Sequence, residues 1–267
     1  MKLTRRETLT LAAAASVAGM LGLPSIAFAK DGDTIDQLKL MAPAGIPDKV
    51  MGNGEAKVTF IEYASPTCPH CALFSNTVLQ PFIEKYVTTG KVKLIIRPFA
   101  RNNTDAAIFM LAEAAARSVD GQLAPTTPDA SSSAPADASS SASADASATS
   151  APAAAPADPT NPSGYSQAAI KAYENLISTF YKTQDTWGLS DKPLDAIKAV
   201  AFQLGFNEES FMTALKDMDF FAKVQTMRDQ AMNDFGLEGT PTFYINGKQL
   251  TGEKTLDVLS AEIDPLL

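Results

Sequence analysis

Both cysteines of the chain stand in one tetrad, Cys68-Pro69-His70-Cys71, shortly after residues 57–63, which have the pattern of a strand. We expect a helix to begin at about Cys68. Two sulfurs at this spacing can close a small disulfide ring at a helix N-terminus, where unpaired N–H groups and the helix dipole favour a thiolate. A thiol of low pKa is a good leaving group, so we expect Cys68 to react first and the deeper Cys71 to resolve. His70 can add a hydrogen bond or a positive charge near the Cys68 sulfur.

Other uses of a cysteine pair fit the sequence less well. A structural disulfide across two residues closes almost no loop, so it stabilises little. Two cysteines and one histidine cannot build a four-ligand zinc site from these residue types within one chain. A c-type haem motif needs histidine after the second cysteine, where Ala72 stands. We therefore expect redox chemistry of the two thiols, with no metal and no cofactor.

Residues 1–29 have the pattern of an export signal. Arg5 and Arg6 belong to a positively charged start, a weakly apolar stretch follows, and Ala27-Phe28-Ala29 offers a cleavage site. The paired arginines resemble a twin-arginine signal, although Thr8 stands where phenylalanine is common. Export would bring the chain into a compartment where disulfides persist. The chain has 22 basic and 30 acidic residues, a net charge of -8, so we expect no binding to nucleic acid.

Residues 124–163 contain only Ala, Ser, Pro, Asp, Thr and Asn. Such a run buries too little apolar surface to offset the entropy of ordering, so its composition predicts disorder. A linker between two domains is the obvious alternative. We favour a loop within one domain, because the segments on its two sides have the patterns of parts of one sheet.

The remaining elements follow from periodicity, caps and turn residues. Pro81 is expected to divide the helix after the tetrad, and Asn246-Gly247 predicts a type I′ hairpin turn. The other predicted elements are a strand over 91–97, helices over 104–118, 165–181 and 220–235, helices starting at Pro193 and Asn207, hairpin strands over 242–245 and 248–250, and a C-terminal helix from about residue 256.

Three motifs together resemble a known family. They are Phe60-Ile61-Glu62-Tyr63, the cysteine tetrad, and Gly239-Thr240-Pro241-Thr242-Phe243. On these residues the chain resembles the DsbA-like thiol:disulfide oxidoreductases of the bacterial periplasm, within the thioredoxin superfamily. The resemblance covers about residues 50–123 and 165–267, and the long low-complexity run departs from the family pattern.

The resemblance implies an α/β fold, a thioredoxin-like sheet with an inserted helical domain. On that basis we expect thioredoxin-like parts at 30–103 and 236–267, and a helical insertion at 104–235 that carries the disordered loop of residues 124–163.

The resemblance also implies site residues beyond the two cysteines. A cis Thr240–Pro241 bond would face the cysteine pair, and with Pro69 these residues would bind an extended substrate peptide. Related proteins place a buried acid below the disulfide, and Glu62 would fill this role by accepting the Cys71 proton. A solvated Glu62 is the alternative, and Lys93 or Arg97 are candidate ion-pair partners.

The expected function is donation of the Cys68–Cys71 disulfide to reduced exported proteins in the periplasm. Reoxidation by a membrane quinone-linked partner and action as a monomer are implied by the family. A disulfide reductase or isomerase kept reduced by a membrane electron donor is the first alternative. The reason is that such relatives also have threonine at the position of Thr240, before the proline that corresponds to Pro241. Only residues 30–55 precede the first core strand, which leaves no room there for the dimerisation domain of the best-known isomerases. A copper-binding protein with two soft thiolate ligands is the second alternative.

Overall fold

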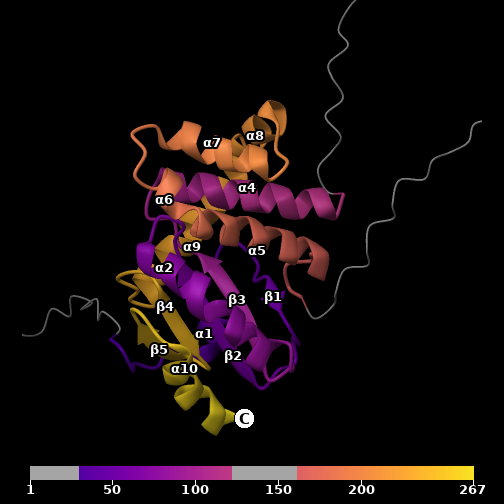
Figure 1. The fold of residues 1–267 in the computed structure, drawn as a ribbon. Helices are drawn as coiled ribbons and strands as arrows, with labels where there is room; N and C mark the ends of the chain where they lie inside the picture. The colour runs from indigo at the N-terminus through magenta and orange to yellow at the C-terminus, as the bar shows by residue number, and fades with distance from the viewer. Residues whose placement is uncertain (1–29, 122–160) are drawn as a thin grey trace, which may run out of the picture.

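The protein is seen in a computed structural model that describes residues 30–121 and 161–267. The expected export signal and most of the expected loop lie outside these ranges. The described residues form a five-stranded sheet in the order β1-β3-β2-β4-β5 (Figure 1). β2 and β3 are parallel, and the other neighbours are antiparallel. The strands are β1 (Val50–Met51), β2 (Val58–Ala64), β3 (Val92–Pro98), β4 (Thr242–Ile245) and β5 (Lys248–Thr251).

The central strand β2 is buried along its whole length, including its polar residues Thr59 and Glu62. Alternation of side chains divides it between two cores. Val58 and Phe60 belong to a core with residues of the helical run after the tetrad and of α10 (Leu256–Ile263). Ile61 and Tyr63 belong to the larger core shared with the other helices. The predicted strands at 57–63 and 91–97 are thereby confirmed.

The hairpin of β4 and β5 forms at the predicted place. Asn246 and Gly247 have φ values of 47° and 91°, as a type I′ turn requires. The Asn246 side chain accepts a hydrogen bond from the Thr59 N–H at 2.8 Å, so the turn is also tied to β2. A Cβ at Gly247 would lie 2.5 Å from the Ile35 carbonyl oxygen, which leaves glycine as the residue that fits.

The helical run after the tetrad continues past Pro81, contrary to the expected division. It comprises α2 (Pro69–Phe74), a π-helical stretch (Ser75–Leu79), α3 (Gln80–Phe82) and a second π-helical stretch (Ile83–Val87). Pro81 stands in the first turn of α3, where the altered hydrogen-bond pattern tolerates its missing N–H. The proline therefore marks a change of helical pitch and not a break.

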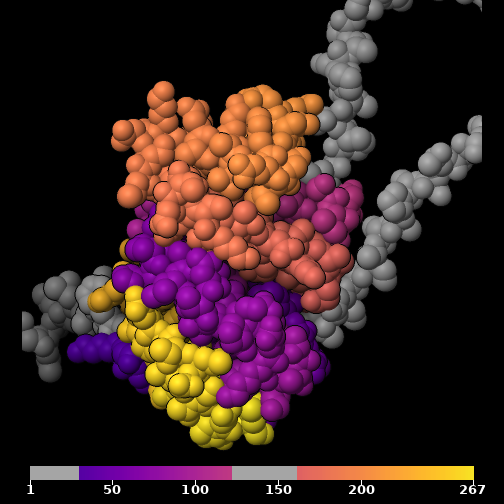
Figure 2. Space-filling model, viewed as in Figure 1, coloured from indigo at the N-terminus to yellow at the C-terminus, as the bar shows by residue number. Residues whose placement is uncertain are grey.

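The helices between β3 and β4 in the chain gather at one end of the sheet, where β2 and β3 finish (Figure 1). On the face drawn in Figure 2, the pink and orange helices lie in direct contact with the purple part of the chain, which contains β2 and β3. Asn207 caps α8 with its side chain on the Ser210 N–H at 2.8 Å, as predicted. The helices are α4 (Asn103–Val119), α5 (Gln167–Lys182), α6 (Gln184–Trp187), α7 (Pro193–Gln203), α8 (Glu208–Leu215) and α9 (Met218–Asp234). A short α1 (Gln37–Leu40) precedes the sheet.

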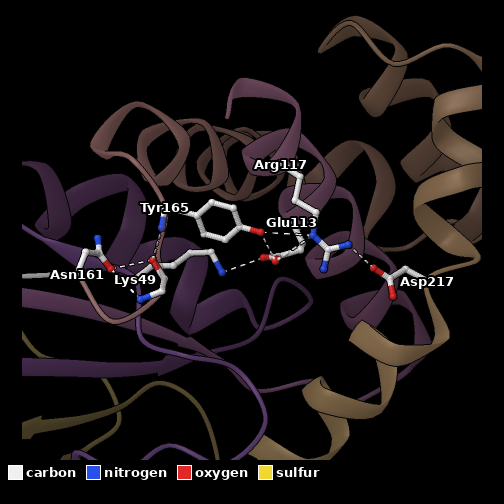
Figure 3. A network of polar contacts seen from close by, with 7 residues as sticks. Lys49, Glu113, Arg117, Asn161, Tyr165 and Asp217 are labelled. Atoms are coloured by element: carbon white, nitrogen blue, oxygen red, sulfur yellow. Dashed lines mark hydrogen bonds and ion pairs between the residues drawn. The ribbon is translucent and has the colours of Figure 1, made fainter. Parts of the chain in front are cut away.

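A buried polar network ties the segment before β1 to these helices (Figure 3). Lys49 Nζ lies 2.8 Å from a Glu113 carboxylate oxygen, and both side chains are buried. The Tyr165 hydroxyl donates to Glu113 at 2.7 Å. Arg117 extends the network to Asp217, the N-cap of α9, at 2.5 Å. The sheet and the helical part are therefore joined by charges as well as by apolar contacts.

The run of residues 124–163 ends in packed structure. Asn161 is buried, and its side-chain amide donates to the Val50 carbonyl at 3.4 Å. Ser163 donates its hydroxyl to Asn161 at 2.7 Å. The expectation of disorder is wrong for these last residues, because asparagine and serine make polar contacts that composition alone does not reveal. Within the described ranges, no helix combines the length and the apolar character needed to cross a bilayer.

Candidate active site

Cys68 lies between the end of β2 and the start of α2. It is the N-cap residue of α2, with Pro69 as the first helical residue and with its own N–H bonded to the Ser65 carbonyl at 3.0 Å. Proline suits this position, since the first helical N–H has no partner within the helix. The Cys68 side chain is buried, while Pro69 and His70 are exposed. The sequence thus folds so that the first sulfur sits at the helix start, as predicted.

The surroundings of Cys68 favour its thiolate. Hydrogen bonding from the Cys71 thiol, together with Thr240 and the N–H groups of Cys71 and His70, outweighs burial and lowers the pKa of Cys68 to about 5. Both thiols are free in the structure. A thiol with this pKa is ionised at neutral pH and leaves readily from a disulfide.

Cys71 has the opposite character. It is fully buried, and burial raises its pKa well above the ordinary thiol value, with further contributions from the Cys68 hydrogen bond and the charge of Glu62. A backbone hydrogen bond from Ser65 acts in the other direction. The pair therefore consists of one thiolate and one protonated thiol at neutral pH.

Glu62 is buried in the middle of β2, with 2% of its surface exposed. Burial raises its pKa well above the ordinary value, and the charges of Glu174 and Cys68 act in the same direction. The solvated alternative is therefore wrong. The ion-pair partners considered from sequence are elsewhere: Arg97 binds the Asp48 carboxylate at 2.7 Å, and Lys93 donates to the Gly54 carbonyl at 3.1 Å.

The His70 imidazole contacts Glu253, whereas we expected it to lie near the Cys68 sulfur. Its Nδ1 lies 2.5 Å from a carboxylate oxygen of Glu253, in the segment after β5, and both side chains are more than half exposed. What His70 contributes to Cys68 is its backbone N–H. The side chain therefore stands beside the site, at its solvent-facing edge.

The Thr240–Pro241 peptide bond is cis, as expected from the resemblance. The Thr240 carbonyl oxygen lies 3.2 Å from the Cys68 sulfur, which donates to it as a thiol. Pro241 is buried directly before β4, and Thr240 is half-buried. Residues that are 172 positions apart in the chain thus meet at the reactive sulfur.

Several residues that surround the site had no signal in the sequence strong enough to single them out. Glu174 on α5 influences Glu62, and its carboxyl pKa is raised to about 8 by burial, opposed by Lys49. Asp105 on α4 and Gln184 on α6 bind the loop before Cys68. An aspartate near a predicted helix start is a weak hint of such a role for Asp105. Nothing local marks Gln184, which reaches the loop from more than a hundred residues away.

The arrangement suits transfer of a disulfide. It offers one activated sulfur at a helix start beside the exposed Pro69 and His70, a buried second sulfur, and a buried carboxyl group with a raised pKa that interacts with the second sulfur. Among the residues that the structure describes, no three His, Cys, Asp or Glu side chains cluster so as to hold a metal ion.

Comparisons with known proteins agree with this geometry. A family model described as thioredoxin matches residues 46–160 and 163–265. A Rickettsia conorii protein named "putative protein-disulfide oxidoreductase" is 24% identical over 220 residues, which are 82% of this chain and 60% of that protein. A Rickettsia felis protein of the same name is 22% identical over equal shares. The chain thus spans about three fifths of the length of these curated relatives.

Two solved structures share the fold. Alpha-DsbA1 of Wolbachia pipientis superposes with a TM-score of 0.62 at 21% identity, over 86% of this chain and 96% of that chain. A structure from Novosphingobium aromaticivorans, described as a protein-disulfide isomerase, has a TM-score of 0.55 at 18% identity, over 84% and 99%.

Proposed function

The chain belongs to the thioredoxin family, with the thioredoxin-like fold and inserted helices expected from its sequence, and we propose that it donates its Cys68–Cys71 disulfide to exported proteins. The observation that carries the proposal is the contrast between the two thiols. The pKa of Cys68 is lowered to about 5, while that of Cys71 is raised. A stabilised thiolate favours the reduced form of the protein, which makes its disulfide a strong oxidant.

The reaction begins when a substrate thiolate attacks Cys68 Sγ. A bond forms between the two sulfurs, the Cys68–Cys71 bond breaks, and the electron pair goes to Cys71. Cys71 then takes a proton, and Glu62 is the acid suited to supply it, because its raised pKa keeps it protonated. Thr240 O, beside Cys68, is the backbone group that an extended substrate segment would pair with.

A second substrate thiolate completes the transfer. It attacks the substrate sulfur of the mixed disulfide, so the substrate disulfide forms and Cys68 leaves as a thiolate. The substrate has lost two electrons, and the protein now holds one thiolate and one thiol. Return to the disulfide requires an electron acceptor, and a membrane quinone-linked partner in the periplasm would serve. This location rests on the export pattern of residues 1–29.

A stoichiometric assay tests the proposal. Oxidised protein is mixed with a synthetic peptide that carries two reduced cysteines, and mass spectrometry follows the loss of two hydrogens from the peptide. We expect one peptide disulfide per protein disulfide, and no oxidation with Cys68→Ser. Cys71→Ser has no disulfide to donate, so it is given the disulfide form of the peptide instead. Its Cys68 thiolate should break that disulfide and hold the peptide as a mixed disulfide, because no second protein thiol is present to resolve it.

The same assay separates the alternatives. A protein that leaves the peptide reduced, yet in its reduced form rearranges a substrate with mispaired disulfides, would be an isomerase. A protein without thiol exchange that binds one Cu(I) through both sulfurs would be a copper carrier.

A further inference from the structure

The loop that leads into Cys68, residues 65–67, is held by α4. Asp105 is fully buried, and one of its carboxylate oxygens accepts the Ser65 hydroxyl at 2.8 Å and the Arg101 N–H at 2.9 Å. The other oxygen accepts the Thr67 N–H at 2.7 Å. A buried carboxylate with three donors is a rigid anchor, because moving it would leave charged oxygen atoms unpaired away from water.

The same loop is also held by α6. Gln184 Nε2 donates to the Pro66 carbonyl at 2.7 Å and to the Cys68 carbonyl at 3.2 Å. α6 is itself fixed, because Trp187 is buried and its indole N–H donates to the Phe180 carbonyl at 2.9 Å. Two different helices, α4 and α6, therefore bind this loop, although neither helix supplies a thiol.

This loop determines where both sulfurs stand. The Cys68 N–H bonds to the Ser65 carbonyl, and a backbone hydrogen bond from Ser65 reaches the Cys71 sulfur. The Cys71 thiol and the N–H groups of Cys71 and His70 bond to the Cys68 sulfur. A shift of the loop would change the hydrogen bonds of the thiolate, whereas the disulfide is held together by its covalent bond.

We propose that Asp105 and Gln184 are positioning residues of the thiol pair, through which the helical part stabilises the reduced state. The thiolate depends on non-covalent placement, so loosening the loop weakens the dithiol form more than the disulfide form. The inference deepens the proposed function and rests on it for the direction of transfer. The equilibrium between dithiol and disulfide can be measured without any substrate protein.

Two variants that keep the net charge test the contacts of the loop with Gln184 and with Asp105. Gln184→Met removes the amide donor at similar size, and Ser65→Ala removes the hydroxyl donor to Asp105. Gln203→Met, at the exposed end of α7, is the matched control. Each protein is equilibrated with reduced and oxidised glutathione, and thiolate absorbance is followed against pH.

We expect each variant at the loop to shift the equilibrium constant with glutathione about three- to tenfold toward the disulfide, as loss of one or two hydrogen bonds implies. The pKa of Cys68 should rise in both, the double variant should shift further, and the control should match the wild type. An unchanged equilibrium and pKa in both folded variants, or an equal loss of stability in the two redox forms, would overturn the proposal. Peptide oxidation by the wild-type protein is judged separately, so the proposed function can fail or hold on its own.

Discussion

Raising the pH from 5 to 9 should stabilise the reduced protein against unfolding while the oxidised protein shows no such gain. Cys68 has a pKa of about 5 in the folded reduced protein and an ordinary value of 9.0 once unfolded. Between these values the unfolded chain binds a proton that the folded chain does not, so stability rises with pH. The contribution is present above the unfolded pKa and is lost as the pH falls through the folded pKa.

The size of the effect follows from the two pKa values. The full difference between the folded and unfolded pKa of Cys68 would add about 3 kcal/mol to the free energy of unfolding at pH 7 and about 5 kcal/mol at pH 9. Solvent screening near the protein surface reduces these figures, and we take about half of each. Cys71 does not contribute up to pH 7, because its thiol is protonated in both states. Near pH 9 the unfolded Cys71 thiol, at its ordinary pKa of 9.0, begins to ionise while the folded one does not, which offsets a small part of the gain. Glu62 is present in both redox forms, so its own titration largely cancels from the difference.

Urea unfolding of the two redox forms at pH 5, 7 and 9 measures this difference. The free energy of unfolding of the reduced form, minus that of the oxidised form, should increase by about 1–2 kcal/mol between pH 5 and pH 7. Cys68→Ser, which has no thiol to ionise at this position, is the control and should lose the slope. Parallel pH profiles for the two redox forms would refute the lowered pKa of Cys68.

Four further outcomes are expected. Cys68→Ser should abolish peptide oxidation, whereas reduced Cys71→Ser should hold the disulfide form of the peptide as a mixed disulfide on Cys68; a mixed disulfide on Cys71 of Cys68→Ser would reverse the roles of the two thiols. His70→Ala keeps the backbone N–H, so thiolate absorbance should still place the pKa of Cys68 well below its ordinary value; a rise to that value would assign the activation to the imidazole. Glu62→Gln should slow peptide oxidation in stopped-flow traces. The same variant should increase the free energy of unfolding at pH 7 but not at pH 4, because it removes a buried acid of raised pKa. Replacing residues 124–160 with a short Gly/Ser linker should leave thermal unfolding within about 1 kcal/mol of wild type, because loop closure costs grow slowly with length; loss of the folded state would contradict this.

Features encoded by neighbouring residues could be predicted from the sequence. The hairpin needs only Asn246-Gly247 between two short segments, of which the first is apolar, and β2 is marked by its own apolar residues. The placement of Cys68 at a helix start likewise needs only the strand before it and Pro69 after it. In each case the physical cause lies within a few positions of the residue concerned.

Features created by distant contacts could not be predicted. The burial of Glu62 depends on α5, which brings Glu174 toward it, and the partner of Arg97 is chosen by the path of the chain before β1. The hydrogen bond from Gln184 to the Pro66 carbonyl joins residues more than a hundred positions apart, so it depends on where α6 packs in the fold. Side-chain charge and size say little about such partners, because tertiary packing selects them.

The redox state of Cys68 and Cys71 inside the cell tests disulfide donation most directly. Rapid acid quenching followed by a thiol-reactive mass label separates the disulfide from the dithiol on a gel. The proposed function predicts that most of the protein carries the disulfide at steady state. A protein found mostly as the dithiol would contradict donation and would identify it as a reductase or isomerase instead.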